Sequence, residues 1–307
     1  MKILVIFTGG TIGSAISQGR ISPFAQCSKE LIARYTESHG ADNVVFETKE
    51  PYRILSENLS AETLNLLTQT VCDSVDSGYD GIIVTHGTDT LQYSAAALSY
   101  SLGNECIPVV LVSSNYPLSD ERANGNANFE AAVEFIKNKC GKGVFVAYRN
   151  SDSVVYFHKG LSLIAHGEAD DNLMSYKNKY YAKLTDNGIA VCDTEKEKIA
   201  PLGALKLAEK SCILAVTACP ADSFCYDISG CKAVVMRPYH SGTLNTASRQ
   251  FADFCKKASE NNVPVYIVNA VEGITYESSA EYEKLGIIPL YNTTFAATYI
   301  KLWADQN

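Results

Sequence analysis

Two short stretches rich in threonine and glycine hold the residues best suited to chemistry. The first, Thr8–Gly13, reads Thr-Gly-Gly-Thr-Ile-Gly and follows the apolar run Ile3–Phe7, which predicts a buried strand. Its glycines permit positive φ angles and close approach of a ligand, and Thr11 supplies a hydroxyl. The spacing matches neither the dinucleotide-binding motif nor the P-loop. This turn alone therefore leaves catalysis and plain ligand binding open.

The second stretch, His86–Thr90, reads His-Gly-Thr-Asp-Thr and follows another apolar run, Gly81–Thr85. Thr88 and Asp89 would serve well as helix caps, which is the simplest interpretation of such a turn. However, parallel strands of an open sheet end at one common edge, where ligands bind. Two turns of this kind on two strands of one sheet favour a functional site over mere capping.

Composition narrows the class of protein. The chain has 307 residues and a formal net charge of −8, which argues against a nucleic-acid surface. No apolar run is long enough to span a membrane, and the apolar start before Gly9 is too short for a signal-peptide core, so we expect a cytoplasmic protein. The ten cysteines include no C-x-x-C pair and the five histidines no metal-ligand spacing, which predicts reduced thiols and no metal.

Alternating strand and helix patterns predict an α/β protein with parallel sheets in both halves. We expect an N-terminal domain over residues 1–185, a linker over 186–207 and a smaller α/β domain over 208–307. The polar stretch Ser14–Gln26 lacks periodicity and is interpreted as a loop, a candidate lid over the first turn. Pro117–Arg122, with its acidic first turn, is expected to open a helix.

Taken together, these motifs resemble the bacterial-type L-asparaginases, and the absence of a signal peptide resembles their cytoplasmic branch. The signatures of that family are similar to Thr8–Gly13 and Val84–Thr90 in this order. The similarity extends to Pro117–Arg122, to the helix containing Asn128–Ala132 and to the loop Arg237–Gly242, so it covers nearly the whole chain.

The resemblance implies a flavodoxin-like N-terminal domain and cofactor-free hydrolysis of L-asparagine to L-aspartate and ammonia. Thr11 corresponds to the nucleophile that forms an acyl-enzyme, and Thr88 to the second catalytic threonine. Asp89 corresponds to the carboxylate that holds the substrate α-amine, and Ser56 to the serine that binds its α-carboxylate. A threonine hydroxyl needs activation to attack an amide, and turn amides beside it are suited to hold the oxyanion.

Gly87 and Glu57 complete the predicted substrate-binding set. In the family, the residue at the Glu57 position influences how well glutamine is accepted, so L-glutamine is a second candidate substrate. The resemblance also implies a homo-oligomer, a dimer or tetramer, in which a neighbouring C-terminal domain completes each site. Thr243 and Asn245 are both candidates for the neighbour's contribution.

Three departures from the family pattern bear on catalysis. The relay lysine, which supports Thr88 and Asp89 in the family, corresponds to Ile164, or to Ala165 if the alignment shifts by one residue. The lid tyrosine corresponds to Arg20, and the aspartate before the binding serine to Leu55.

Several alternatives therefore stay open. A working asparaginase would need an altered relay, using water, His86, Lys159 or a neighbouring subunit. An asparaginase-like amino-acid-binding protein with weak or altered amidase activity, or a glutaminase-asparaginase, would keep the same motifs. A component of a tRNA-linked amidotransferase is expected to carry a domain before the first signature, and a nucleotide or sugar-phosphate binder a basic residue beside the glycine-rich turn.

Overall fold

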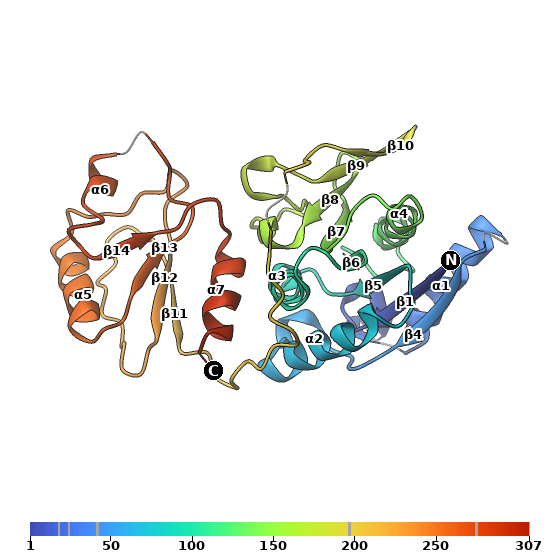
Figure 1. The fold of residues 1–307 in the computed structure, drawn as a ribbon, viewed down its shortest axis with the longest axis horizontal. Helices are drawn as coiled ribbons and strands as arrows, with labels where there is room; N and C mark the ends of the chain where they lie inside the picture. The colour runs from blue at the N-terminus through green and yellow to red at the C-terminus, as the bar shows by residue number, and fades with distance from the viewer. Residues whose placement is uncertain (18, 24, 41–42, 196–197, 274–275, 307) are drawn as a thin grey trace. The chain divides into compact units, whose positions relative to one another are not determined.

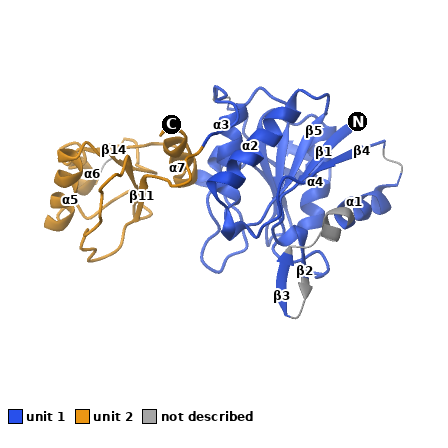
Figure 2. Ribbon diagram, turned by 90° about the horizontal axis from the view of Figure 1, so that it is seen from below, with its two compact units in different colours: residues 1–206 blue, residues 207–307 orange. Residues whose placement is uncertain are grey.

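The computed structural model describes residues 1–17, 19–23, 25–40, 43–195, 198–273 and 276–306. Contacts within the chain divide it into two compact units, Met1–Lys206 and Leu207–Asn307 (Figure 2). Each unit contains a β-sheet with helices packed on it, which confirms the predicted α/β class (Figure 1).

The first unit is built on one large sheet. Across the sheet the order is β10 (Gly188–Val191), β9 (Ala182–Thr185), β8 (Val155–Lys159), β7 (Val144–Arg149), β6 (Val109–Val112), β5 (Gly81–Thr85), β1 (Lys2–Phe7) and β4 (Val45–Lys49). The central strands β1, β5 and β6 consist almost wholly of buried apolar residues. The five strands from β7 to β4 are parallel and have the order of the flavodoxin-like fold. The chain order reverses between β1 and β5, which is where such folds bind their ligands.

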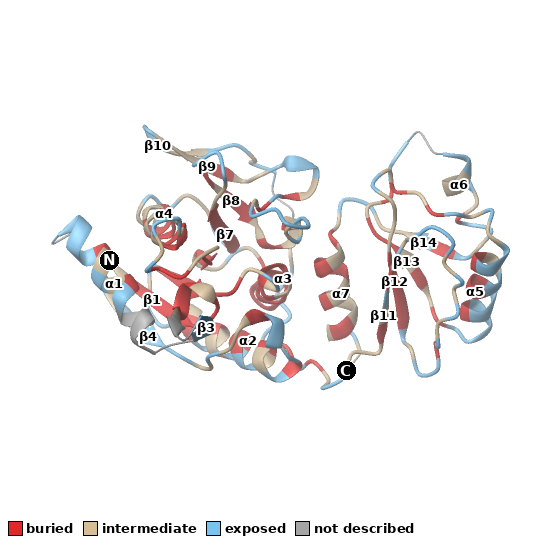
Figure 3. Cartoon of the chain, turned by 180° about the vertical axis from the view of Figure 1, so that it is seen from behind, coloured by how far each residue is buried: buried red, intermediate tan, exposed pale blue. Residues whose placement is uncertain are grey.

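Helices cover both faces of this sheet, and buried residues, red in Figure 3, lie on the central strands and on these helices. The apolar side chains between the sheet and the helices form two cores. One face packs against α1 (Ala25–His39) and α4 (Gly125–Lys137). The other face packs against α2 (Ala61–Val75) and α3 (Leu91–Leu102). Ser60 caps α2, because its hydroxyl accepts the Thr63 N–H in a capping box.

The parallel part of the sheet is extended by β8, β9 and β10, which run antiparallel to their neighbours. Three sequence-based expectations are wrong in this unit. Part of the expected linker 186–207 is a strand, because Asp186-Asn187-Gly188 turns the chain so that β10 pairs with β9. The expected lid loop Ser14–Gln26 contains a hairpin of β2 (Ser14–Ser17) and β3 (Arg20–Pro23), with residues 18 and 24 outside the described part.

The third error concerns α4, which begins at Gly125 and not at Pro117. Residues 117–123 instead form turns, in which Asp120 N–H donates to Pro117 O at 2.9 Å and Ala123 N–H donates to Asp120 O at 3.0 Å. The Asp120 carboxylate accepts hydrogen bonds from Arg122, so it stabilises a turn and not the start of a helix.

The second unit contains a smaller parallel sheet of β11 (Ile213–Thr217), β12 (Ala233–Arg237), β13 (Val265–Ile267) and β14 (Ile287–Pro289), in that order. Helix α5 (Arg249–Glu260) packs on one face and α7 (Phe295–Ala304) on the other. The short helix α6 (Glu277–Ala280) and the 3₁₀ turns η1 (Thr11–Gly13), η2 (Ser56–Asn58), η3 (Gly160–Ser162) and η4 (Tyr176–Asn178) complete the elements.

Candidate active site

The first signature forms a tight turn at the carboxyl end of β1. Thr11 is half-buried and opens the 3₁₀ turn η1. Gly10 has φ 71° and ψ 179°, a backbone conformation open essentially to glycine alone. The start of the turn is fixed by the buried Thr8 hydroxyl, which donates to Thr85 O at 2.6 Å. This bond joins the ends of β1 and β5, whose register pairs Phe7 with Thr85.

The two signature turns meet backbone to backbone. A Cβ atom added to Gly10 would lie 2.3 Å from Gly87 N, far inside van der Waals contact. The Thr11 turn and the Thr88 turn are therefore adjacent, as the sequence predicts from the ends of two neighbouring strands. Gly87 is buried, whereas Thr88 is half-buried.

A third segment completes this junction. Gly9 forms a β-bridge with Ile54, and Gly10 N–H donates to Ile54 O at 2.8 Å. This pairing brings η2 to the signature turns, so that a Cβ atom on Gly87 would lie 2.4 Å from Ser56 Oγ. Ser56 is only 5% exposed. We call the meeting of these three segments, around Gly10, Ser56 and Gly87, the three-turn junction.

The predicted substrate-binding residues lie around this junction. Ser56 Oγ donates to Asp89 Oδ2 at 3.5 Å, a long contact between a hydroxyl and a carboxylate from two different turns. The buried Gln92 side chain donates from Nε2 to Asp89 O at 3.1 Å. Asp89 and Glu57 are both exposed. The arrangement thus offers one anionic group and one hydroxyl donor side by side, as an amino-acid zwitterion requires.

The capping interpretation of Thr88 and Asp89 is wrong, because the N-cap of α3 is Thr90. Thr90 makes no side-chain cap bond to the helix. Its hydroxyl instead donates to Ser56 O at 2.8 Å. Thr90 is not among the site residues expected from the sequence, although it lies one residue after Asp89 at the start of a helix.

His86 has a structural role in this turn. Its Nδ1 lies 2.8 Å from Gly87 O, which can only accept, so Nδ1 carries the proton; Nε2 then accepts from Ser94 Oγ at 2.8 Å. Burial lowers the pKa of His86, so the imidazole is neutral. With both nitrogens engaged, His86 does not replace the relay lysine.

Lys159 is also excluded as a substitute. It pairs with Phe145 near the start of β7, at the sheet edge opposite the signature turns. Its Nζ donates to Asp193 Oδ2 and to Glu195 O, both at 2.8 Å. Ile164, at the expected lysine position, is half-buried, and its N–H donates to Met174 O at 3.1 Å.

The hairpin β2–β3 projects from the first unit beside η1 (Figure 2). Arg20, at the position where the resemblance predicts a lid tyrosine, is exposed at the start of β3. The hairpin is tied to the Thr11 turn by Ser14 Oγ, which donates to Gly10 O at 2.7 Å.

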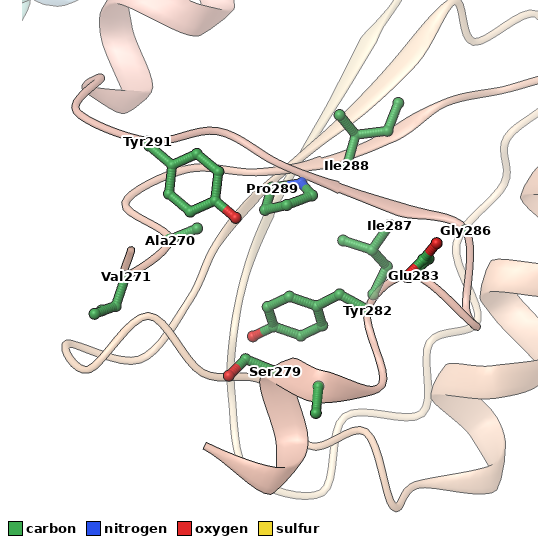
Figure 4. A pocket seen from close by; sticks show the side chains of 11 residues that line it. Ala270, Val271, Ser279, Tyr282, Glu283, Gly286, Ile287, Ile288, Pro289 and Tyr291 are labelled. Carbon is green, nitrogen blue, oxygen red and sulfur yellow. The ribbon is translucent and has the colours of Figure 1, made fainter. Parts of the chain in front are cut away.

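A cavity of about 510 Å³ lies elsewhere, within the second unit (Figure 4). The rings of Tyr282 and Tyr291 and the side chains of Ser279 and Glu283 line it, and the Tyr282 hydroxyl donates to Gly242 O at 2.9 Å. No residue of the predicted site lines this cavity. Because this cavity contains none of the candidate nucleophiles, we place the candidate active site at the signature turns and not at the cavity.

Three further expectations from the sequence concern metal binding, membrane-spanning helices and the residues Thr243 and Asn245 of the second unit. Within the described residues, no group of three or more histidine, cysteine, aspartate or glutamate side chains is placed to hold a metal ion. Of the helices in the described ranges, none is long and apolar enough to cross a membrane. Thr243 and Asn245 lie in the loop after β12 of the second unit, between that strand and α5.

The family model "Asparaginase, N-terminal" matches residues 2–187. The L-asparaginase of Thermococcus kodakarensis is 27% identical over 322 residues, covering 99% of this chain and 92% of that protein. One component of the glutamyl-tRNA(Gln) amidotransferase of Methanococcus vannielii is 28% identical over 327 residues, covering 98% of this chain and 73% of that protein. The structure of L-asparaginase I from Vibrio cholerae superposes with a TM-score of 0.77 at 22% identity, covering 100% of this chain and 93% of the other.

Proposed function

This chain belongs to the asparaginase family, and from that premise we propose that it hydrolyses the side-chain amide of L-asparagine to L-aspartate and ammonia. The observation that carries the proposal is the three-turn junction. Backbone contact between Gly10 and Gly87 supports a site that holds Thr11 and Thr88 together, beside Ser56 and Asp89.

In the proposed reaction, the Thr11 hydroxyl attacks the amide carbon and its proton leaves with the nitrogen as ammonia. The resulting ester between Thr11 and the aspartyl group is then cleaved by water, which restores the hydroxyl. Asp89 holds the substrate α-amine and Ser56 its α-carboxylate, while N–H groups of the turn are suited to the oxyanion. Thr88 orients the attacking group from the second turn.

The proton transfer in this proposal uses water, since His86 and Lys159 are both engaged elsewhere and position 164 is isoleucine; a group of a neighbouring subunit is the remaining alternative. General acid–base help contributes about 10²–10⁴-fold. We therefore expect turnover that is slow compared with an enzyme carrying the lysine. Glu57, exposed beside Ser56, keeps L-glutamine as a second substrate to compare.

The decisive experiment measures ammonia release from L-asparagine and L-glutamine by the purified protein and by Thr11→Ala. We expect release by the wild type and a loss of at least about 10³-fold in the variant, since removal of a nucleophile leaves only binding and oxyanion contacts. Release that is equal in both proteins would contradict the role of Thr11. Binding of aspartate without any release would leave an amino-acid-binding relative.

The similarity to a component of an amidotransferase supplies a second candidate, ammonia release coupled to glutamyl-tRNA(Gln). The same assay distinguishes it, because that activity would depend on charged tRNA and on partner proteins. Release from free asparagine by the protein alone favours the first candidate. Gel filtration of the same sample tests the predicted dimer or tetramer.

A further inference from the structure

Thr90 is placed where its hydroxyl would ordinarily stabilise its own helix. It is the N-cap of α3, and threonine at this position usually accepts a hydrogen bond from the N–H of the first helical turn. No such bond exists here, and the hydroxyl donates to Ser56 O at 2.8 Å instead. A local interaction is thus replaced by one that spans 34 positions in sequence.

The carbonyl oxygen of Ser56 has a hydrogen-bond donor besides the Thr90 hydroxyl. Ser56 O also accepts Leu59 N–H at 3.0 Å, within η2, so the carbonyl would stay satisfied without Thr90. What the Thr90 hydroxyl adds is a link between two turns. One turn carries Ser56 and the other carries Asp89, the residue directly before Thr90.

We propose that Thr90 is a positioning residue, whose hydroxyl fixes the spacing between Ser56 and Asp89 so that both ends of an amino-acid substrate are held at once. The inference rests on the proposed function, in which Ser56 holds the α-carboxylate and Asp89 the α-amine. The direct contact between these two side chains is long, at 3.5 Å, and is free to open when a substrate enters. The shorter Thr90 bond lies between the backbone of one turn and the helix start of the other, and it stays.

Thr90→Val removes the hydroxyl and keeps the shape of the side chain. We expect a five- to tenfold rise in KM for asparagine, about the effect of one hydrogen bond, with kcat changed by less than about twofold. The preference for asparagine over succinamate, which lacks the α-amine, should fall by a similar factor, because simultaneous binding of both ends is lost. Thr90→Ser keeps the hydroxyl and should restore both quantities.

A matched control is Thr70→Val on α2, which removes a similar bond from a hydroxyl to Leu66 O at 2.7 Å, away from the junction. It should leave KM unchanged. A lower melting temperature of Thr90→Val with unaltered KM and unaltered substrate preference would show a purely structural role and overturn the proposal. Failure of Thr90→Ser to restore KM would overturn it as well.

The dissociation constant of L-aspartate, measured by calorimetry, separates this inference from the proposed function. Wild-type protein that binds aspartate but releases no ammonia would overturn the hydrolase proposal alone, and the five- to tenfold weakening in Thr90→Val would then still be required. Turnover by the wild type with an unchanged KM in Thr90→Val would overturn the positioning role alone. Wild-type protein with neither binding nor turnover would overturn both.

Discussion

The three-turn junction and the segment 163–175 belong to the same unit but depend on their side chains to different degrees. At the junction, backbone packs on backbone, and Gly10 and Gly87 leave no room for a Cβ atom. The segment 163–175 is held by a bridge between Leu163 and Ser175 and by side-chain hydrogen bonds, such as those of Asn150 to the backbone of Leu173. The relay lysine that the family resemblance implies for this segment would act through the tip of one long side chain.

This difference gives a physical reason for the pattern expected from the sequence, in which the signature turns match the family and position 164 departs from it. A turn whose geometry admits only glycine cannot change without losing the contact it makes. A position that supplies a proton donor through a flexible side chain can change to Ile164 while the fold stays intact. A match to the two signature motifs therefore indicates that the backbone geometry of the turns is kept. Whether the chain keeps a group that transfers the proton is a separate question.

The largest effect is expected where the junction is closed to any side chain. Gly10→Ala would place a Cβ atom against Gly87 and strain a backbone at φ 71°, so we expect a loss of about 2–4 kcal/mol in the free energy of unfolding and no measurable amide hydrolysis. Denaturant unfolding and the ammonia assay measure these quantities. Gly13→Ala is the control, because no atom lies within 4 Å of its added Cβ. Equal stability of the two variants would refute the backbone contact.

The next effect concerns the segment 163–175. Ile164→Lys should raise kcat for asparagine by about 10–100-fold, part of the range for general acid–base help, while KM changes little. Ile164→Met is the control for side-chain length without a proton. Lys159→Met should leave kcat within about twofold, because Lys159 is bound to Asp193 at the opposite sheet edge. A drop in kcat on loss of Lys159 would instead identify it as the relay.

A smaller effect is expected from His158, which is buried beside this segment and bonded to Ser175 Oγ at 2.8 Å. Burial, followed by the neighbouring His166, lowers the pKa of His158 to about 3. In the unfolded chain the pKa is about 6.5, so between these values only the unfolded state binds the proton. Stability should therefore be full above about pH 6.5 and fall by up to about 1.4 kcal/mol per pH unit below it.

Chemical denaturation between pH 5 and pH 7.5 checks this dependence. His158→Gln should flatten the pH profile, whereas His240→Gln, an exposed control, should leave it unchanged. His86 and His166 contribute in the same direction, because burial lowers the pKa of each. An unaltered slope in His158→Gln would exclude His158 as a source of acid sensitivity.

Much of the parallel core could be predicted because its strands are buried on both faces and read as continuous apolar runs. Ile3–Phe7 and Gly81–Thr85 were located correctly, and from them the meeting of the two signature turns followed. The hairpin β2–β3 was missed because its residues are small and polar, so no alternation marks its strands. The strands β9 and β10 were missed because their Asp-Asn-Gly turn was interpreted as a linker.

At the site, sequence and physics alone reach Thr11, Thr88 and Asp89, since these follow two strands of one sheet. Ser56 could be predicted as a site residue only from the family resemblance. Its position depends on the bridge between Gly9 and Ile54, which no local sequence pattern predicts. The role of Thr90 could not be predicted, because its hydroxyl makes a long-range hydrogen bond in place of the local capping bond that its position predicts.

The three-turn junction also has a consequence for the kinetics of folding. Its members, Gly10, Ser56 and Gly87, come from segments tens of residues apart, and loops of that length must close before they touch. Helices such as α2 can form from local contacts well before this happens. After dilution from denaturant, the rate at which amide hydrolysis returns should therefore report the formation of the three-turn junction at the ends of β1 and β5. The rate at which the circular-dichroism signal of the helices returns should not report it.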